Sequence, residues 1–592
     1  MNKTYTYQHS LPSLPVPSLN STKEKLQEWI APLVSEAQFM DTTAEIERFF
    51  SFGGEAEMLQ QKLHEWDDAQ SGSWLAPLWN DLYLQHRDSL PVTSNFNVLL
   101  QPNEEADLSV VEIAGKVSTL VAEFYHSIVD ETLEPVMQRG QPLDMSQYKS
   151  MFRSMRIPRS TCDDFYLAEL SKVDNYVVLI YKNRFYKISV TDMTGMILDQ
   201  QLLVEAIEDT VFSDDTEAEN VSIFTAAERE VAAEVYDELI SSEVNVNTLN
   251  TIADALVVIS IDEDSEHAED AIKNVMLHPT NKYFDKTIQI AITKQGQIGF
   301  NVEHSAVDGT SMASVIHYIS KQLAGEQVPN NISGEHPTIE QQLWDVTDQL
   351  KERLEQIGND YVERAHQYAL LPKLFTDFGA EQIKALNISP DAFFHIALQL
   401  AQYRTYGEFK SVYEPVSVRF FAEGRTECAR ATSMEKRYVV EAIESGQESN
   451  DRLYALLQMA SDAHAKRIGE CQRGLGIERH LYGLEQMYYR YGEELGIEKL
   501  PAIFTDKGYK ALRHDFISTS GMPYENAMYR MFAPVTEDGH GLAYFLTDDM
   551  ISINISSFLH NEINGNLLKN NLIEALQQLR MIALTEQAFE IA

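Results

Sequence analysis

The segment that most limits how this chain can fold is residues 287–309, where two strand patterns lead directly into a helix. Residues 287–293 alternate as a β-strand does, a Gly-containing turn covers 294–296, and a second short strand pattern covers 298–302. A helical pattern follows Gly309. The segment therefore predicts a chain that mixes strands and helices, with polar residues placed where a strand ends.

His304 and Asp308 are the chemically useful residues of this strand-to-helix connection. Imidazole has an unperturbed pKa of about 6.5, so His304 could take a proton from an alcohol or a thiol near neutral pH. The Asp308 carboxylate could hold the loop by pairing with an Arg or with backbone N–H groups. Thr310 or Ser311 is the expected N-cap of the helix. Because the chain has 16 His residues, this pattern alone leaves a structural role for His304 open.

A chain of 592 residues is too long for one hydrophobic core, and we expect two sizeable domains. Three early prolines favour an extended arm, which we group with the first helix as residues 1–50. Residues 51–346 form the expected N-terminal half with the candidate His, and residues 347–592 form the C-terminal half. Residues 176–190 are expected to form a β-hairpin. The predicted fold class is mixed α/β in two halves.

The formal net charge of -43 argues against a nucleic-acid partner and against adhesion to anionic membranes. An anionic substrate would need a local group of basic residues. No apolar run reaches 18 residues, so no membrane span is predicted. The first residues contain no signal-peptide pattern, and three cysteines fit a reducing compartment, so we expect a cytoplasmic protein without a metal site.

Four further motifs follow in the second half of the chain, and with the His304 segment they keep a fixed order and spacing. They are Ile388-Ser389-Pro390-Asp391-Ala392-Phe393; Tyr413-Glu414 followed by Gly424-Arg425-Thr426-Glu427; Arg479-His480-Leu481; and Ser518-Thr519-Ser520 followed twelve residues later by Phe532-Ala533-Pro534. In this arrangement the sequence resembles the choline/carnitine O-acyltransferase family from about residue 6 to about residue 585.

The resemblance implies two chloramphenicol-acetyltransferase-like α/β halves with an active-site tunnel at their interface. It also implies that the N-terminal arm and first helix, residues 1–50, pack with the C-terminal half. It also implies reversible transfer of an acyl group between CoA and the hydroxyl of carnitine. CoA and acyl-CoA would be cosubstrates, with no permanently bound cofactor, and we expect a monomer. His304 matches the general base of the family, which acts without an acyl-enzyme, and base catalysis of this kind is worth roughly 10²–10⁴-fold.

The resemblance also implies the other site residues. Ser520, in the hydroxyl motif with Ser518 and Thr519, resembles the donor to the tetrahedral oxyanion, and Asp308 belongs with the catalytic set. The loss of such a donor costs on the order of 10²–10³ in turnover. The carnitine members bind their acceptor through an Arg, a Thr, a Tyr and an aromatic residue facing the trimethylammonium. The matching residues here are Arg479, Thr426, Tyr413 and Phe532.

Arg479 is the residue that separates the two acceptors, because carnitine has a carboxylate and choline has none. The choline members have Asn at the position of Arg479 and Val at the position of Thr426, and this sequence has neither. An Arg–carboxylate pair is charge-assisted and can be bidentate, so it can discriminate strongly. A structural alternative, in which Arg479 forms a buried salt bridge with one of the many acids, stays open.

The CoA-binding residues match the family less well. A Lys expected four residues before Lys384 is Ala380, and Gly521 stands where a Gln is common. Lys466 or Arg467 could supply the missing positive charge. The resemblance implies four CoA-binding residues: Lys384, Ser389, Asp391 and Glu414.

Arg530 lies at the position that sets acyl chain length in this family. Its bulk predicts short acyl groups such as acetyl or propionyl. Alternatively, its guanidinium could meet the carboxylate of a dicarboxylic acyl group, or it could extend out of the pocket to solvent. Two other functions remain open: acyl transfer to choline or another amino alcohol, and non-catalytic binding of acyl-CoA or carnitine.

Overall fold

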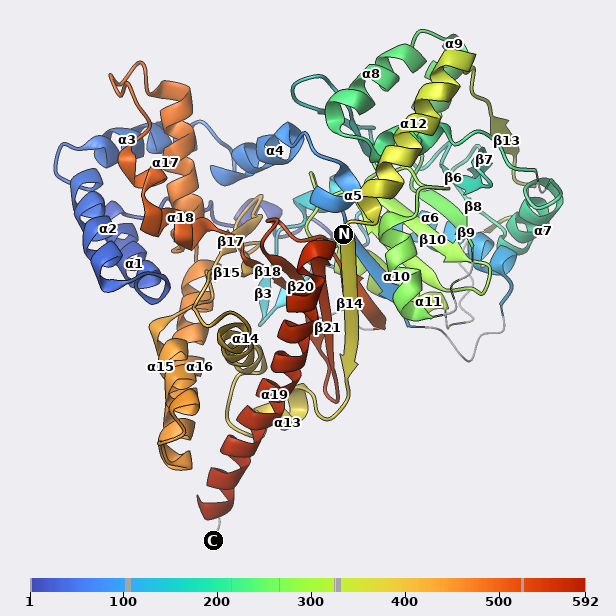
Figure 1. The fold of residues 1–592 in the computed structure, drawn as a ribbon. Coiled ribbons are helices and arrows are strands. Elements are labelled where there is room, and N and C mark those ends of the chain that lie inside the picture. The colour runs from blue at the N-terminus through green and yellow to red at the C-terminus, as the bar shows by residue number, and fades with distance from the viewer. Residues whose placement is uncertain are drawn as a thin grey trace. The chain divides into compact units, whose positions relative to one another are not determined.

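The computed structural model describes residues 3–101, 108–214, 216–263, 265, 267–323, 325, 332–522 and 526–590 (Figure 1). The chain divides into two compact units, and each is discontinuous in sequence. Unit 1 lies within Met1–His9, Asn80–Tyr368 and Tyr524–Ala533, and unit 2 lies within Ser10–Trp79, Ala369–Pro523 and Pro534–Ala592.

These units correct the expected boundaries after residues 50 and 346. The N-terminal helices belong to unit 2 up to Trp79, because they pack on helices from the C-terminal part of the chain. Thr42 Oγ1, for example, donates a hydrogen bond to Asp506 at 2.7 Å. Conversely, residues 524–533 belong to unit 1, because the strand they contribute completes its sheet. The helices and strands that make these contacts are α2 (Glu36–Phe49), α3 (Glu55–Asp68), α17 (Glu478–Tyr491), α18 (Lys507–Arg513) and β19 (Ala527–Met531).

Unit 1 is built around an eight-stranded sheet of order β13-β7-β6-β9-β10-β11-β1-β19. The β9 strand pairs in parallel with β6 and β10, and the other neighbours are antiparallel. The remaining strands of this sheet are β1 (Phe96–Leu100), β6 (Tyr176–Tyr181), β7 (Arg184–Ser189), β9 (Val258–Asp262), β10 (Ile288–Thr293), β11 (Ile298–Val302) and β13 (Ile339–Gln342).

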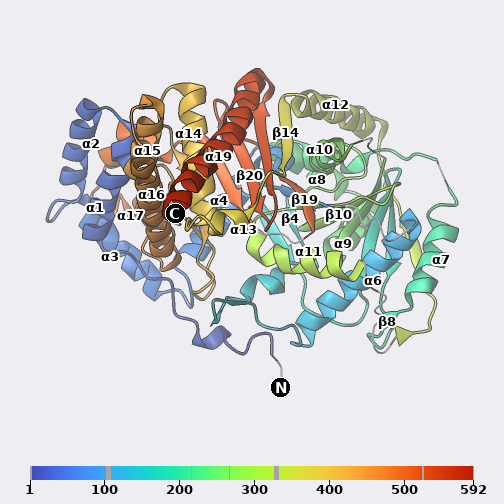
Figure 2. The ribbon, with the colours of Figure 1, turned by 90° about the horizontal axis from the view of Figure 1, so that it is seen from below.

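Helices cover both faces of this sheet, with α6 and α11 on one side and α10 and α12 on the other (Figure 2). A Cβ on Gly299 would lie 2.3 Å from Val275 of α10, so the glycine allows this helix to approach β11 closely. The helices of unit 1 are α5 (Leu90–Thr93), α6 (Val110–Val129), α7 (Gln200–Thr210), α8 (Arg229–Leu239), α9 (Glu243–Asp254), α10 (Ala268–Leu277), α11 (Gly309–Leu323) and α12 (Asp348–Ala365); α4 (Leu75–Gln85) spans the boundary.

The expected strands around the candidate His are confirmed, and so is the hairpin over residues 176–190. Its turn residues, Lys182 and Asn183, have φ of 50° and 60°, the left-handed pair that a two-residue hairpin turn requires. The expected N-cap is wrong. Helix α11 begins at Gly309, so Thr310 and Ser311 lie in its first turn.

Unit 2 contains a five-stranded sheet of order β14-β21-β20-β18-β15. Helices α14 and α19 pack on each other and on this sheet, and their apolar residues form the core of the unit. The elements are β14 (Tyr368–Phe375), β15 (Val412–Tyr413), β18 (Ile517–Gly521), β20 (His540–Leu546), β21 (Ile551–Phe558), α1 (Leu19–Ile30), α13 (Ala380–Lys384), α14 (Pro390–Tyr406), α15 (Met434–Ser445), α16 (Asn450–Gln472) and α19 (Glu562–Glu590).

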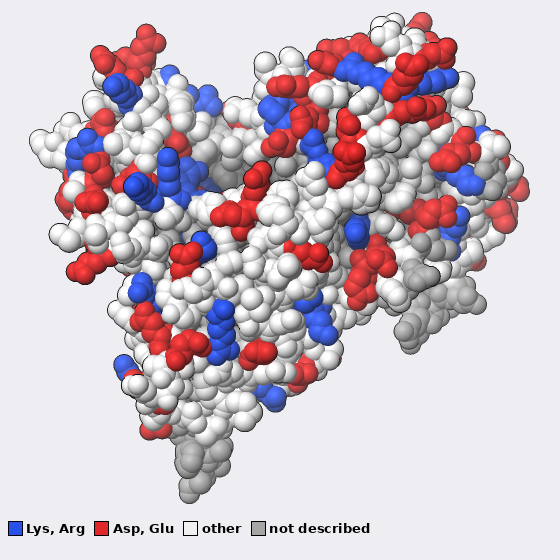
Figure 3. Space-filling model, viewed as in Figure 1, with Lys and Arg blue, Asp and Glu red and all other residues white. Residues whose placement is uncertain are grey.

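The predicted mixed α/β class in two halves is therefore confirmed. Short two-stranded sheets complete the fold: β2 (Met137–Gln138) with β3 (Gln141–Pro142), β4 (Ser154–Ile157) with β5 (Asp164–Leu167), β8 (Ile197–Leu198) with β12 (Ile332–Ser333), and β16 (Pro415–Ser417) with β17 (Thr426–Cys428). Among the described helices, none combines the length and the apolar character that a membrane span requires. On the face seen in Figure 3, acidic and basic side chains are intermingled.

Candidate active site

His304 lies in the connection between β11 and α11 of unit 1, where the sequence predicted it. Its imidazole stacks on Tyr83, with ring centres 5.1 Å apart and planes 22° apart. Phe96 packs edge-on against the same imidazole, also at 5.1 Å. The side chain is 24% exposed. The two aromatic rings thus restrict rotation of the imidazole while part of it remains accessible.

Asp308 lies close to His304, and Gln147 holds it there. Its Oδ1 is 3.7 Å from His304 Nδ1, which is longer than a hydrogen bond but close enough to favour a positive charge on the imidazole. Gln147 Nε2 donates to Asp308 Oδ2 at 2.8 Å, and the Asp308 N–H donates to Gln147 Oε1 at 2.8 Å. A neutral amide is therefore one partner of this carboxylate, and the sequence did not indicate it.

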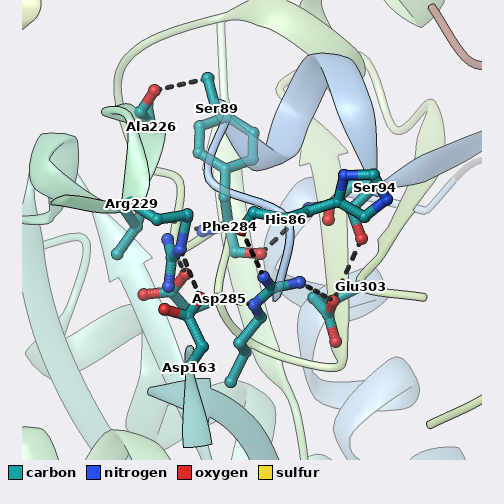
Figure 4. A network of polar contacts seen from close by, with 12 residues as sticks. His86, Ser89, Ser94, Asp163, Ala226, Arg229, Phe284, Asp285 and Glu303 are labelled. Carbon is teal, nitrogen blue, oxygen red and sulfur yellow. Dashed lines mark hydrogen bonds and ion pairs between the residues drawn. The ribbon is translucent and has the colours of Figure 1, made fainter. Parts of the chain in front are cut away.

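Glu303, the residue before His304, joins the loop to a network of polar contacts in unit 1 (Figure 4). Its fully buried carboxylate accepts hydrogen bonds from Ser305 Oγ at 2.6 Å and from Ser94 Oγ at 3.2 Å. Arg156 Nη1 lies 3.6 Å from the same carboxylate and donates to Ser305 Oγ at 3.4 Å. The residues flanking His304 are consequently tied to charged groups inside unit 1.

The Arg156 guanidinium continues into a network of buried ion pairs. Asp163 Oδ2 accepts from Nε of Arg156 and Nε of Arg229, each at 2.6 Å, and Arg229 Nη1 donates to Asp285 at 2.7 Å. These side chains are inaccessible to solvent. Burial raises the pKa of Asp285 to about 7, against the opposing effect of Arg229. This network could not be recognised in the sequence. Glu303 is the member that lies beside a motif, because it directly precedes His304.

Three of the expected acceptor-binding residues lie together in unit 2. Arg479, on α17, donates from Nη2 to the Tyr413 hydroxyl at 2.7 Å and from Nε to the Thr426 carbonyl at 3.1 Å. Its guanidinium carbon lies 3.9 Å from the centre of the Trp79 ring. The residue is 3% exposed. The arrangement fixes a positive charge in one orientation, and Trp79 is a contact that sequence analysis did not predict.

The salt-bridge alternative for Arg479 is met only weakly. Glu478 Oε1 lies 4.0 Å from Arg479 Nη1 as a long buried ion pair, whereas the same oxygen is 2.9 Å from Arg430. Among the described residues, the hydrogen bonds of the Arg479 guanidinium go to two neutral oxygens, the Tyr413 hydroxyl and the Thr426 carbonyl. This guanidinium can therefore pair with the carboxylate of a ligand.

The hydroxyl motif lies on β18, beside the Tyr413 end of β15. Ser518 pairs with Tyr413 in the parallel ladder, and Thr519 Oγ1 donates to the Tyr413 carbonyl at 2.8 Å. Thr519 thus positions Tyr413, whereas Ser520 is half-buried one residue further along the strand. Phe532 is half-buried just after β19 and belongs to unit 1.

Residues 14–574 match the family model described as choline/carnitine O-acyltransferase. The chain belongs to this family. It is 28% identical to human carnitine O-acetyltransferase, over 97% of this chain and 94% of the relative. It is 29% identical to zebrafish (Danio rerio) choline O-acetyltransferase, over 96% of this chain and 92% of the relative. It is also 26% identical to rat mitochondrial carnitine O-palmitoyltransferase 2, over 94% of this chain and 89% of the relative.

In this acyltransferase, two expected CoA-binding residues belong to a polar cluster in unit 2. Asp391 Oδ1 accepts from the Tyr544 hydroxyl at 2.6 Å, and its Oδ2 lies 3.1 Å from His464 Nε2. Glu414 Oε1 lies 3.6 Å from the same nitrogen, and burial followed by the nearby Asp391 raises the pKa of Glu414 well above its usual value. The Asp391 side chain is 43% exposed, so the cluster has an accessible side.

Gly521, which stands where a Gln is common in the family, lies against this cluster. A Cβ on Gly521 would lie 2.6 Å from the Tyr544 hydroxyl oxygen, so a side chain there would displace the phenol from Asp391. Asp391, Glu414 and His464 also offer ligand atoms within 4.8 Å of one another, a spacing that a divalent ion could bridge. The Lys436 ammonium, 2.9 Å from His464 Nδ1, places a competing cation beside them.

The other two expected CoA-binding residues, Lys384 and Ser389, lie outside this polar cluster. Lys384 is 63% exposed, with Asp548 at 3.9 Å, and Ser389 precedes the first residue of α14. Arg467 is wrong as a replacement for the missing lysine, because its Nη1 donates to the carbonyls of Arg430 and Thr432 at 2.7 and 3.0 Å. Lys466 is exposed and stays a prediction.

Proposed function

We propose that this acyltransferase transfers a short acyl group between CoA and the hydroxyl of carnitine. The observation that carries the proposal is the orientation of Arg479, whose positive charge is buried and held by neutral oxygens and an indole ring. Carnitine supplies a carboxylate for such a guanidinium, and choline supplies none. Charge-assisted pairing of this kind is about twice as strong as a neutral hydrogen bond.

His304 is the general base of the proposed reaction. Its Nδ1 is the nitrogen near Asp308, which leaves Nε2 to take the proton from the carnitine hydroxyl. The alcohol oxygen attacks the thioester carbonyl carbon, and Ser520 donates a hydrogen bond to the oxyanion that forms. The C–S bond then breaks, and the proton passes from the imidazolium to the thiolate of CoA. The Asp308 carboxylate stabilises the imidazolium between these two proton transfers.

CoA is the proposed cosubstrate, and the acyl group is proposed to be short. The partly exposed Asp391 carboxylate and the exposed Lys384 support a CoA contact in unit 2. Arg530 supports a short acyl group, because its large side chain is 4% exposed and so remains inside the protein. This burial rules out the alternative in which Arg530 extends to solvent.

The acceptor can be tested by initial rates of thiol release from a CoA thioester with L-carnitine, with choline, or with neither. The proposal predicts a kcat/KM for carnitine at least about tenfold above that for choline, since one charge-assisted bond is worth roughly 1.5–3 kcal/mol. Equal or faster release with choline would contradict the carnitine assignment. That outcome would favour the second candidate, acyl transfer to choline, which the zebrafish choline O-acetyltransferase relative supports.

A further inference from the structure

Glu427 is a buried acid next to the residue that is proposed to bind the carnitine carboxylate. It follows Thr426 on β17 and is 5% exposed. Its Oε1 accepts hydrogen bonds from the backbone N–H of Cys428 at 2.7 Å and from the backbone N–H of Arg479 at 3.0 Å. A carboxyl group is thus fixed at the base of the Arg479 side chain by neutral donors.

The surroundings of Glu427 are largely closed to bulk solvent. Glu427, Thr426 and Arg479 line one small cavity of unit 2, whose volume of about 10 Å³ matches about one water molecule. A Cβ on Gly476 would lie 2.5 Å from Glu427 Oε2, so this glycine lets the backbone approach the carboxyl group closely. A charge on Glu427 therefore acts on its neighbours at a low effective dielectric constant and with little screening by salt.

The charge of Glu427 can change near neutral pH, whereas the charges beside it are fixed. Burial raises the pKa of Glu427 to about 7, against the opposing effect of Arg479. Glu478, the other acid near Arg479, pairs with Arg430 at 2.9 Å, and this pair keeps it ionised.

The remaining groups packed against Glu427 stay neutral. Burial raises the pKa of the Cys428 thiol on the same strand to about 12, and it raises the pKa of the Cys471 thiol on α16 well above its usual value. The paired strand β16 and the N-terminal arm, whose Pro15 and Pro17 line the cavity, contribute neutral side chains. Protonation in this neighbourhood at about pH 7 is therefore protonation of one carboxyl group.

We propose that Glu427 determines how strongly Arg479 attracts a carboxylate, because it carries a negative charge in one protonation state and none in the other. This inference rests on the proposed function and adds a determinant of acceptor choice. When Glu427 is ionised, its charge cancels part of the attraction between Arg479 and the carnitine carboxylate. When Glu427 is protonated, the attraction is complete, so the binding of carnitine should be accompanied by proton uptake.

Choline separates this effect from a general effect of pH, because it has no carboxylate. Two unit charges about 8 Å apart, at an effective dielectric constant of about 20, change a binding constant by more than about tenfold. We expect KM for carnitine to rise by about tenfold from pH 6 to pH 8, relative to KM for choline. Titration of the His304 base would change the kinetics with both acceptors alike and would leave this ratio constant.

A purely structural role is the alternative for Glu427, in which it only accepts the two backbone hydrogen bonds. Glu427→Gln separates the two roles, because its amide oxygen can still accept both bonds while the side chain is neutral at every pH. In this variant KM for carnitine at pH 8 should fall about tenfold, to the value that the native protein has at pH 6. A structural role predicts that the variant keeps the native dependence on pH. Glu441→Gln is the matched control and should behave as the native protein does, since Glu441 is an exposed acid paired with Arg437 on α15.

Titration calorimetry of the native protein with L-carnitine tests the inference without any variant. Measurements at pH 7 in buffers of different ionisation enthalpy, such as Tris and PIPES, give the number of protons taken up. We expect roughly 0.3–0.5 proton per carnitine and none per choline. Carnitine binding without proton uptake, or equal uptake in a folded Glu427→Gln protein, would overturn this inference alone. No carnitine binding at any pH between 6 and 8 would overturn the proposed function as well.

Discussion

The surroundings of His304 in unit 1 (the base region) and those of Arg479 in unit 2 (the acceptor region) hold their key residues in opposite ways. Around His304 the charged groups flank the loop, where Arg156 pairs with both Glu303 and Asp163 out of contact with solvent. Around Arg479 the charge is the candidate ligand-binding group itself, and neutral oxygens and the Trp79 ring hold it.

The difference shows how one chain can use buried charge in two ways. A charge that is neutralised by protein partners positions a neighbouring residue and is satisfied whether or not substrate is present. A charge whose hydrogen bonds go to neutral groups keeps an attraction for a ligand carboxylate, since the protein carboxylate paired with it, Glu478, lies at 4.0 Å and is closer to Arg430. Substitutions in the two regions should therefore differ in whether they affect stability or the choice of acceptor.

The stability of the base region should depend most on Asp163, whose carboxylate accepts hydrogen bonds from two buried guanidinium groups. Asp163→Asn would remove the carboxylate that both guanidinium groups share, leaving Arg229 with Asp285 and Arg156 with Glu303 at 3.6 Å. Because one partner of a buried ion-pair network is lost, the free energy of unfolding of unit 1 should fall by about 3–5 kcal/mol. The next residue, Asp164, is a matched control, because its pair with Arg159 is solvent-exposed and worth about 0–1 kcal/mol. Urea unfolding followed by circular dichroism should separate Asp163→Asn from Asp164→Asn. Equal midpoints would show that the network does not stabilise the base region.

Glu478 provides the corresponding test in unit 2, where it pairs with Arg430 and leaves Arg479 to a ligand. Although burial alone would raise it, Arg430 and Arg513 lower the pKa of Glu478 from 4.5 to about 2. The carboxylate therefore contributes stability that is fully present above about pH 4.5 and is lost as the pH falls toward 2. This contribution amounts to about 3 kcal/mol.

The measurement is the difference in unfolding free energy between the native protein and Glu478→Gln as a function of pH. The difference should be largest at neutral pH and should shrink below pH 4.5. Glu485→Gln is the control, since Glu485 pairs with Arg513 at a partly exposed position. A difference that stays constant from pH 7 to pH 3 would contradict the ion-pair account.

Arg479→Asn removes the charge that the acceptor region holds for a ligand. We expect kcat/KM for carnitine to fall by about 10- to 100-fold, as for the loss of one charge-assisted bond, so that the carnitine-to-choline ratio falls with it. Arg490→Asn removes an exposed guanidinium from the same helix, also packed on a Trp ring, and should leave the ratio unchanged. Parallel losses with both acceptors in Arg479→Asn would indicate a structural role.

Tyr413→Phe should have the smallest effect, because it removes one neutral hydroxyl that accepts from Arg479 Nη2. A neutral hydrogen bond contributes about 0.5–1.5 kcal/mol, so KM for carnitine should rise by a few-fold with little change in kcat. Tyr403→Phe is the control, since its ring is stacked on Phe409 at 5.0 Å elsewhere in unit 2. An unchanged KM in Tyr413→Phe would show that the hydroxyl does not orient the guanidinium.

Local features of the fold could be predicted from the sequence because they depend on nearby residues. The strand pair before His304 and the Lys182-Asn183 turn follow from alternation and from backbone conformations that a short hairpin requires. The grouping of Tyr413, Thr426 and Arg479 was accessible only through the family resemblance, since the three residues are far apart in the chain.

Features set by distant contacts could not be predicted. Gln147 is joined to Asp308 across 161 positions, and no periodic pattern marks either Gln147 or Arg156. The strand carrying Arg530 joins the sheet of unit 1 although it follows most of unit 2 in sequence. Arg467 was a candidate CoA-binding residue in the sequence, because its hydrogen bonds to distant backbone carbonyls cannot be predicted from a sequence pattern.

The central claim is that His304 removes the proton from an acceptor hydroxyl while a thioester is cleaved. The direct test is free-thiol release from acetyl-CoA and succinyl-CoA with L-carnitine or choline, for the native protein, His304→Ala and the exposed-site control His336→Ala. We predict acceptor-dependent release that falls by roughly 10²–10⁴-fold in His304→Ala and is unchanged in His336→Ala. Acceptor-dependent release that persists at the native rate in a folded His304→Ala protein would contradict the account.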